Sequence, residues 1–357
     1  MEQPVRRIRC ESPEQKMWDL YALLENEPTV KPFLEEKYRR QSIDSPSRAA
    51  FQNTQAFIYH IKQARETYRA ARQADLMIRP LLSYYGMMNL CKAWMLSRDP
   101  EYPRSTSVMR HGVSTRKRKK QGFRFRQDEV RIQQEGLFSE MARVQGWSRL
   151  IGEVFTVGEL FALLPEVQDG YRQLTRNPSL FLVAVPEPYQ FRDEGMPFYV
   201  EEGILDALHV TPRGLIDKLN RNRPAKAVYM FRSGEESALS HGRLRLLWSH
   251  PKVRHVDHWE WGFHHPFFRE DTQGGYYLVP GGKRPLLLMP ELFIHYLLLF
   301  SVSMLCRYET PLWGEMLYGF SSEDLLLIQE FLHVTQRKFP NLILNELFEE
   351  KLIFGVI

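Results

Sequence analysis

The sequence predicts an α+β fold that is mainly helical, with a helical body formed by both ends of the chain and a strand-containing middle region. Apolar stretches at residues 76–96 and 292–305, one near each end, predict buried helices. From about residue 179, short apolar runs alternate with turn residues, which is typical of strands. Of the 357 residues, 43% are hydrophobic and 25% are charged, so the chain can bury a substantial core and is not expected to be disordered.

Residues 1–98 form the N-terminal helical part. From 46 to 72, apolar residues recur at helical spacing opposite polar positions, which indicates an amphipathic helix. The stretch at 76–96 is apolar nearly all round and should be buried on most sides. Pro80 suits the first turn of that helix, where a missing amide proton costs nothing.

Residues 99–150 form a polar, basic connector, and residues 151–287 form a mixed α/β region. The pair Thr156 and Glu159 has the spacing of a capping box and predicts a helix start. A second helix should begin at Thr211 and Pro212. Strands are predicted at 180–185, 227–231, 244–248 and 276–279.

Residues 288–357 form the C-terminal helical part, which we expect to pack on the N-terminal helices because neither apolar helix can face solvent. The longest apolar run, 292–306, contains His295 and two serines and is shorter than a bilayer span, so no membrane segment is expected. The segment 321–324 should cap a helix, and Pro340 should open the last one.

The compartment predicted from the sequence is the cytosol. Residues 1–16 are polar and charged, unlike the apolar stretch of a secretory signal. The three cysteines, Cys10, Cys91 and Cys306, are odd in number and widely spaced, which argues against a disulfide framework or a cysteine zinc site.

Four blocks carry a resemblance to a known family. They read RPLLSYYGMMNLCKA at 79–93, STSVMRHGVSTRKRKKQGF at 105–123, SMLCRYETPLW at 303–313 and FPNLILNEL at 339–347. The chain resembles the YaaC-like family in these blocks, which span roughly residues 50 to 350 and so cover most of it. The resemblance implies no particular activity, cofactor or catalytic residue.

The helical parts also resemble the HEPN superfamily of nucleotide-binding and RNA-cleaving helical proteins. Ribonucleases of that superfamily carry an arginine and, several residues later, a histidine on one helix. Arg104 with His111 and Arg245 with His250 have this spacing. The first pair falls in a predicted loop and the second in a predicted strand, so neither has the context of the motif.

The basic block at 116–120, with the residues that flank it, is the feature that points most specifically to a function. Clustered cations gain counterion-release free energy on a polyanion, and phenylalanines that alternate with arginines offer stacking faces for bases. The alternative is a solvated loop, or a charged surface paired with acidic residues elsewhere. The candidate binding residues in this block are Arg110, Arg116, Lys117, Arg118, Lys119, Lys120, Phe123, Arg124, Phe125 and Arg126, with Arg131 flanking them.

Histidines supply the candidate catalytic residues. His111 lies beside cations, which should lower its pKa, keep it neutral and suit it to act as a general base; the alternative is a loop histidine without a task. His255 and His258 lie in a segment that also contains His250, His264 and His265. Its spacing matches no metal motif, so we expect no metal and interpret these residues as partly buried histidines with hydrogen-bonded neighbours.

Arg307 follows the second apolar helix and has two interpretations. It can cap the C-terminus of that helix or pair with Glu309 or Glu315, which we favour. Alternatively, its guanidinium binds a phosphate or carboxylate in a cleft.

The leading functional prediction is binding of a phosphate-rich ligand, RNA or a nucleotide, through the segment 110–131. A nuclease or nucleotide hydrolase that uses the histidines is one alternative, so enzymatic activity stays open. A regulatory protein that docks on an acidic partner is the other. No duplex-reading module, P-loop or nucleophile motif is evident, and we expect no cofactor. An oligomer is compatible with the sequence.

Overall fold

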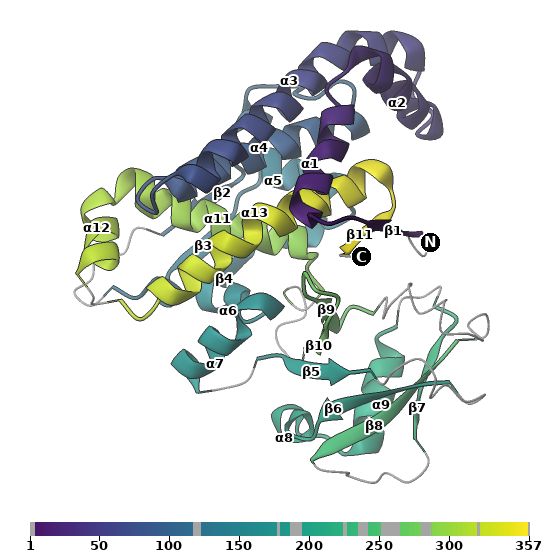
Figure 1. Ribbon diagram of the computed structural model, residues 1–357, viewed down its shortest axis with the longest axis vertical. Helices are drawn as coiled ribbons and strands as arrows, with labels where there is room; N and C mark the ends of the chain where they lie inside the picture. The colour runs from purple at the N-terminus through teal and green to yellow at the C-terminus, as the bar shows by residue number, and fades with distance from the viewer. Residues whose placement is uncertain are drawn as a thin grey trace. The chain divides into compact units, whose positions relative to one another are not determined.

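A computed structural model describes residues 4–116, 123–176, 179–185, 195–223, 227–234, 242–250, 265–279, 286, 288–319 and 322–355. The fold is α+β and mainly helical, which confirms the predicted fold class. The chain divides into a helical unit, made of Arg6–Phe161 and Pro290–Ile357, and a mixed unit, made of Ala162–Met289 with Met1–Val5. The predicted basic connector, 99–150, therefore belongs to the helical unit (Figure 1).

The helical unit is built from both ends of the chain. Its strands are β1 (Val5–Arg9), which pairs with β11 (Lys351–Gly355), and a sheet of order β2-β3-β4 made of Val113–Thr115, Glu129–Ile132 and Val154–Thr156. Its helices are α1 (Pro13–Leu23), α2 (Glu27–Arg40), α3 (Pro46–Gln73), α4 (Arg79–Arg98), α5 (Leu137–Val144), α6 (Val157–Phe161), α11 (Glu291–Tyr308), α12 (Thr310–Tyr318) and α13 (Leu325–Phe348).

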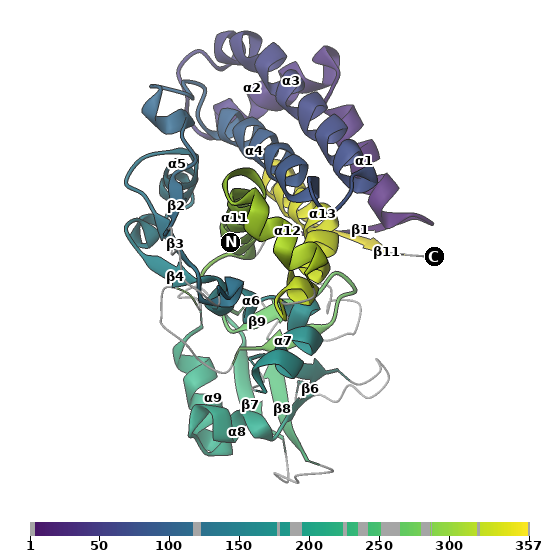
Figure 2. The same cartoon turned by 90° about the vertical axis from the view of Figure 1, so that its left-hand side faces the viewer.

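Helix α4 is the centre of this unit. It contacts α3 on one side and α11 and α13 on the other (Figures 1 and 2). Gly86 makes the approach to α3 possible, because a Cβ there would lie 2.7 Å from the Tyr68 ring. Buried polar groups fix the contact with α11, where the Tyr296 hydroxyl lies 3.2 Å from Met88 Sδ. As predicted, α4 is buried nearly all round because its apolar residues occupy every side.

Local signals in the sequence place several helix ends correctly. The capping box is confirmed, because the Thr156 amide donates to Glu159 Oε2 at 2.8 Å and the Glu159 amide donates to Thr156 Oγ1 at 3.2 Å. In α9 (Pro212–Arg221), the predicted cap at Thr211 accepts a hydrogen bond from the Gly214 amide at 3.2 Å.

Two predictions about the last helix are wrong. Pro340 does not open a helix but lies inside α13. A proline costs about 3 kcal/mol within a helix, whereas burying Ile343, Leu344 and Leu347 beyond it contributes about 1.5–3 kcal/mol for each side chain. In the predicted cap, the Asp324 carboxylate does not cap α13, because it binds Arg126 instead.

Helix α11 is long and apolar enough to cross a membrane, although its apolar run was expected from the sequence to be too short. However, 78% of that stretch is buried inside the fold, and core helices of soluble proteins meet the same criteria. His295 in this helix is buried and contacts Thr335 Oγ1 at 2.9 Å. The burial and polar pairing are those of a core helix.

The mixed unit contains an antiparallel sheet. Its order is β7-β8-β6-β5-β10-β9, formed by Met230–Ser233, Arg243–Ser249, Met196–Glu201, Phe181–Ala184, Tyr276–Leu278 and Phe268–Glu270. The four predicted strands are present, with ends shifted by up to three residues. Asn220 of α9 ties that helix to β7, because its side chain exchanges hydrogen bonds with the backbone of Phe231 at 2.8 and 2.9 Å. Two further helices belong to this unit, α7 (Gln168–Thr175) and α8 (Gly203–Leu208).

Candidate functional site

The structure describes only part of the predicted basic segment. Lys117, Arg118, Lys119 and Lys120 lie outside the described residues. Arg116, at the end of β2, keeps 65% of its side chain exposed, and its Nη1 lies 3.5 Å from Glu129 Oε2 across the sheet. Such an exposed pair is weak, so Arg116 remains accessible to an anion.

Two candidates in this segment are structural. Phe125 is fully buried, with its ring centroid 6.3 Å from that of Phe161, so it cannot stack on a base. Arg126 binds the Asp324 carboxylate through Nε and its backbone amide, and the two side chains are only 15% and 3% exposed. A terminal guanidinium nitrogen of Arg126, Nη2, lies 3.5 Å from Glu323 Oε2. This arginine neutralises a buried acid and is not a ligand group.

The other described candidates are at least partly accessible. Arg110, Arg124 and Arg131 are exposed, and Phe123 is half-buried. In β3, burial alternates along the strand, so Arg131 points away from the core formed by its neighbours. The segment therefore mixes structural residues with solvent-facing cations.

His111 is held rigidly between helices. Its carbonyl oxygen accepts a hydrogen bond from the Tyr296 hydroxyl at 2.7 Å and one from the Phe138 amide at 3.3 Å, at the start of α5. Gly112 and Gly136 let the backbone segments cross, since a Cβ on Gly136 would lie 2.3 Å from the Gly112 nitrogen. The backbone of His111 is therefore fixed by contacts with α11 and with the start of α5.

A hydrogen bond 2.6 Å long joins the Tyr84 hydroxyl and His111 Nδ1. Burial raises the pKa of Tyr84, so its hydroxyl keeps its proton, and this hydroxyl also interacts with the Tyr296 hydroxyl. In one tautomer of neutral His111, Tyr84 donates to Nδ1 and the imidazole proton sits on Nε2; in the other, Nδ1 donates to the Tyr84 oxygen.

The pKa of His111 is lowered, as the sequence predicted, but chiefly by burial and then by Arg307 and Lys92. The imidazole therefore stays neutral near pH 7. A neutral ring with its proton on Nε2 offers a hydrogen-bond donor at that nitrogen. The general-base role expected from the sequence stays a prediction.

Arg307 lies in the last turn of α11, where its charge interacts favourably with the helix dipole, as the sequence predicted. Among the described residues it forms no ion pair with Glu309, Glu315 or any other carboxylate. Its guanidinium lies over the rings of Tyr85 and Tyr308, 5.6 and 4.9 Å from their centroids, and Nη2 donates to the Tyr308 hydroxyl at 3.0 Å. Binding of an anion by Arg307 stays a prediction.

Lys92 is a second cation without a carboxylate within ion-pair distance in the described part of the chain. It shares one face of α4 with Tyr85 and Asn89, because these positions are spaced at helical intervals. Asn89 Oδ1 lies 3.0 Å from His60 Nδ1 on α3. Burial lowers the pKa of His60, and Lys92 lowers it further. We call Lys92, His111 and Arg307 the open cluster.

A surface pocket of about 480 Å³ adjoins the open cluster. Arg110 and His111 line one part of it, and Gln133, Gln134 and Glu135 of the turn before α5 line another. Its volume is within the range of small-ligand sites.

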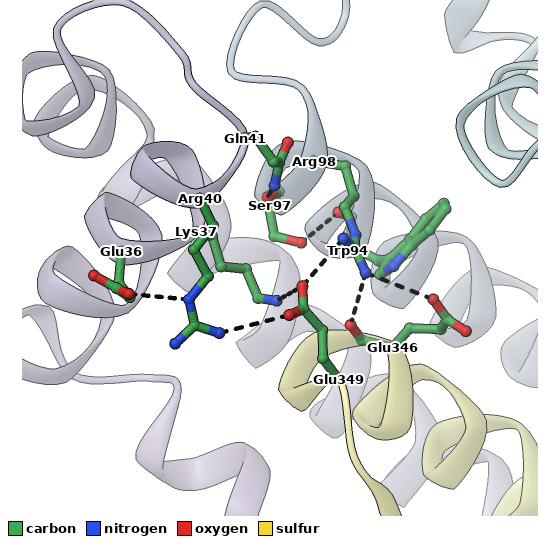
Figure 3. Close-up of polar contacts among 9 residues, drawn as sticks. All are labelled: Glu36, Lys37, Arg40, Gln41, Trp94, Ser97, Arg98, Glu346 and Glu349. Atoms are coloured by element: carbon green, nitrogen blue, oxygen red, sulfur yellow. Dashed lines mark hydrogen bonds and ion pairs between the residues drawn. The ribbon is translucent and has the colours of Figure 1, made fainter. Parts of the chain in front are cut away.

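A second group of cations in the helical unit is neutralised. In Figure 3, Lys37 and Arg98 converge on Glu349, with Nζ–Oε1 and Nη1–Oε1 distances of 2.8 and 3.1 Å. Arg40 lies 3.6 Å from the same carboxylate, and Arg98 also contacts Glu346. We call these five residues the paired cluster. The paired cluster borders a pocket of about 370 Å³, but its cations already form ion pairs with its two carboxylates.

The histidine segment is described only at its two ends. His255, His258 and His264 lie outside the described residues. His265 is buried, and both ring nitrogens are engaged, Nε2 with the Leu219 carbonyl at 2.9 Å and Nδ1 with the Phe267 amide at 3.1 Å. Burial lowers its pKa to about 4. This histidine is a neutral core residue and not a metal ligand.

The arginine–histidine pairs do not form a helical motif. Arg104 pairs with Asp99, at 3.1 Å, in the turn after α4, and His111 lies outside any helix. Arg245 lies in β8, and His250 follows that strand.

Comparison with known proteins gives one match. A family model described as "YaaC-like Protein" matches residues 22–347. Neither a curated protein nor a solved structure matches the chain.

Proposed function

The chain belongs to the YaaC-like protein family, and we propose that it binds a phosphate-bearing ligand, RNA or a nucleotide, at the open cluster. His111 donates from Nε2, Lys92 and Arg307 supply positive charge, and Arg110 extends the site along the pocket. The exposed arginines of the segment 110–131 add to the field that attracts the ligand. Phe125 and Arg126, which are buried and paired, are not part of the site.

One observation carries this proposal. Half-buried Lys92 and Arg307 have no carboxylate within ion-pair distance among the described residues, and both act on the same fixed histidine. Charged groups removed from water are ordinarily paired, because desolvating an unpaired charge is costly. An anion from outside the chain supplies the missing partner.

Phosphate fits this arrangement better than a single carboxylate does. The donors come from three different elements, α4, α11 and the loop before β2, so they can surround a group that has several oxygens. Strand β2 leads from this loop to the exposed Arg116. A ligand with more than one phosphate would gain from each cation along this path.

A calorimetric titration with inorganic tripolyphosphate at low salt tests the proposal. Replacing Lys92 or Arg307 with Gln should weaken binding about tenfold or more, since each removes a charge-assisted contact. Arg39→Gln is the matched control, because Arg39 is exposed but already pairs with Glu35 and Glu36. It should leave the affinity unchanged.

Two results would overturn the proposal. One is the absence of tripolyphosphate binding by the folded wild-type protein at low salt. The other is equal binding by the wild type and the Lys92→Gln/Arg307→Gln double variant. Equal binding would assign the anion to other cations, and the open cluster would then have no part in recognition.

A further inference from the structure

We propose that the ligand of the open cluster is single-stranded nucleic acid, whose bases stack on Tyr85 and Tyr308 while its phosphates meet Lys92, His111 and Arg307. This inference rests on the proposed function and adds the substrate class. It assigns two tyrosines that the sequence did not single out for binding, one in the N-terminal and one in the C-terminal helical part.

The two tyrosines are unusually accessible for their positions. Tyr85 is 42% exposed and Tyr308 is 55% exposed, although they lie in α4 and α11, two helices whose residues are mostly buried. Their neighbours Tyr84 and Tyr296 are fully buried. The exposed part of each ring is a surface on which a base can stack.

Arg307 joins the two rings into one surface. Its guanidinium lies 5.6 Å from the Tyr85 centroid and 4.9 Å from the Tyr308 centroid. A guanidinium held on aromatic rings is oriented without being neutralised, so its charge stays available to a phosphate oxygen. The hydrogen bond to the Tyr308 hydroxyl fixes its position further.

The acidic residues near this surface do not cancel its charge. Glu309 follows Tyr308 and Glu135 lines the adjoining pocket, but neither forms an ion pair with Lys92 or Arg307 in the described part of the chain. The charged groups that shift the pKa of His111 are both cations. The local field therefore favours a polyanion.

A strand fits this surface better than a mononucleotide or a duplex. A mononucleotide has one base, whereas two exposed rings flank the guanidinium. In a duplex the base faces are stacked on each other and cannot reach a tyrosine, whereas single strands offer a free face at every base. Arg110 and Arg116 lie on the segment that contains His111, so further phosphates of a strand that passes His111 can meet these exposed cations.

The test measures fluorescence anisotropy of labelled oligouridylate, about ten nucleotides long, over a series of salt concentrations, with tripolyphosphate as competitor. Tyr85→Ala and Tyr308→Ala should each weaken binding roughly 5- to 150-fold and leave the salt dependence unchanged, because stacking involves no counterion. Tyr85→Phe should bind like the wild type. Phe51→Ala, which removes an exposed ring on α3, is the control and should have no effect.

Replacing the cations should, in contrast, change the salt dependence of binding. Lys92→Gln and Arg307→Gln should each reduce the slope of log affinity against log salt by about 0.7, the value for one phosphate contact on a single strand. A variant that is merely misfolded would lose affinity without this separation between affinity and slope.

The outcomes separate the two proposals. If tripolyphosphate binds through the open cluster but oligouridylate binds no more tightly, or binds equally to the Tyr85→Ala and Tyr308→Ala variants, the nucleic-acid inference is wrong and the anion site survives. If a mononucleotide binds as tightly as the oligomer, the strand is also ruled out. If neither polyanion binds, both proposals fail.

Discussion

The paired cluster and the open cluster both use cations of helix α4, yet they differ in their neighbours. In the paired cluster, Arg98 and buried Lys37 contact the Glu349 carboxylate (Figure 3). In the open cluster, the Arg307 guanidinium lies over two tyrosine rings, and neither Arg307 nor Lys92 has a carboxylate within ion-pair distance among the described residues. The same residue types therefore stabilise the fold in one place and, in our proposal, bind an external anion in the other.

The largest expected effect lies in the paired cluster. Glu349→Ala should lower the free energy of unfolding by about 3 kcal/mol, because it leaves buried Lys37 without its hydrogen-bonded partner. Glu350→Ala is the control, since Glu350 pairs with Arg6 at the surface. It should cost less than about 1 kcal/mol in the same urea titration. Equal effects would mean that burial does not distinguish these pairs.

A smaller effect is expected where the open cluster meets the core. His111→Ala should lower the free energy of unfolding by about 1–3 kcal/mol, because the buried Tyr84 hydroxyl loses its acceptor. Adding Tyr84→Phe should recover much of this loss, since the unsatisfied group is then absent. Urea unfolding of the two single variants and the double variant measures the coupling. Additivity within about 0.5 kcal/mol would show that the two residues do not interact.

The smallest effect should come from the cations of the open cluster. Lys92→Gln should change the free energy of unfolding by less than about 0.5 kcal/mol, because Lys92 has no carboxylate partner to lose among the described residues. Arg307→Gln should lower it by about 0.5–1 kcal/mol, because it removes the contacts with the Tyr85 and Tyr308 rings. Thermal unfolding in a buffer without phosphate measures this. A loss comparable to that of Glu349→Ala would show that these cations have structural partners after all.

The sequence predicted those features that depend on neighbours along the chain. The burial of α4 follows from its own apolar residues, and the Thr156–Glu159 cap needs only two residues three positions apart. Pro340 was misread because the packing of distant helices outweighs its local preference against a helix interior.

The site was predicted less well, because each role depends on partners far away in sequence. Arg126 reads as one more cation of a basic run until Asp324, 198 residues later, is seen to bind it. His111 was a candidate, but its hydrogen-bond partner is Tyr84 and its lowered pKa comes partly from Arg307. Tyr85 lies in a stretch that is apolar nearly all round, and no local signal separates its exposed ring from the buried ring of Tyr84.

The most direct test of the anion site is a titration of the His111 imidazole followed by ¹⁵N NMR, with sodium sulfate as a phosphate-like dianion and sodium chloride at equal ionic strength as control. In chloride, we expect a neutral ring at pH 7 with the proton on Nε2 and a pKa below the ordinary value for histidine, because the imidazole is partly buried and lies near Arg307 and Lys92. In sulfate, the pKa should rise, because a bound anion favours the imidazolium, and Arg307→Gln should reduce the rise. An Nδ1 proton, or the same pKa in both salts, would contradict an anion site at His111.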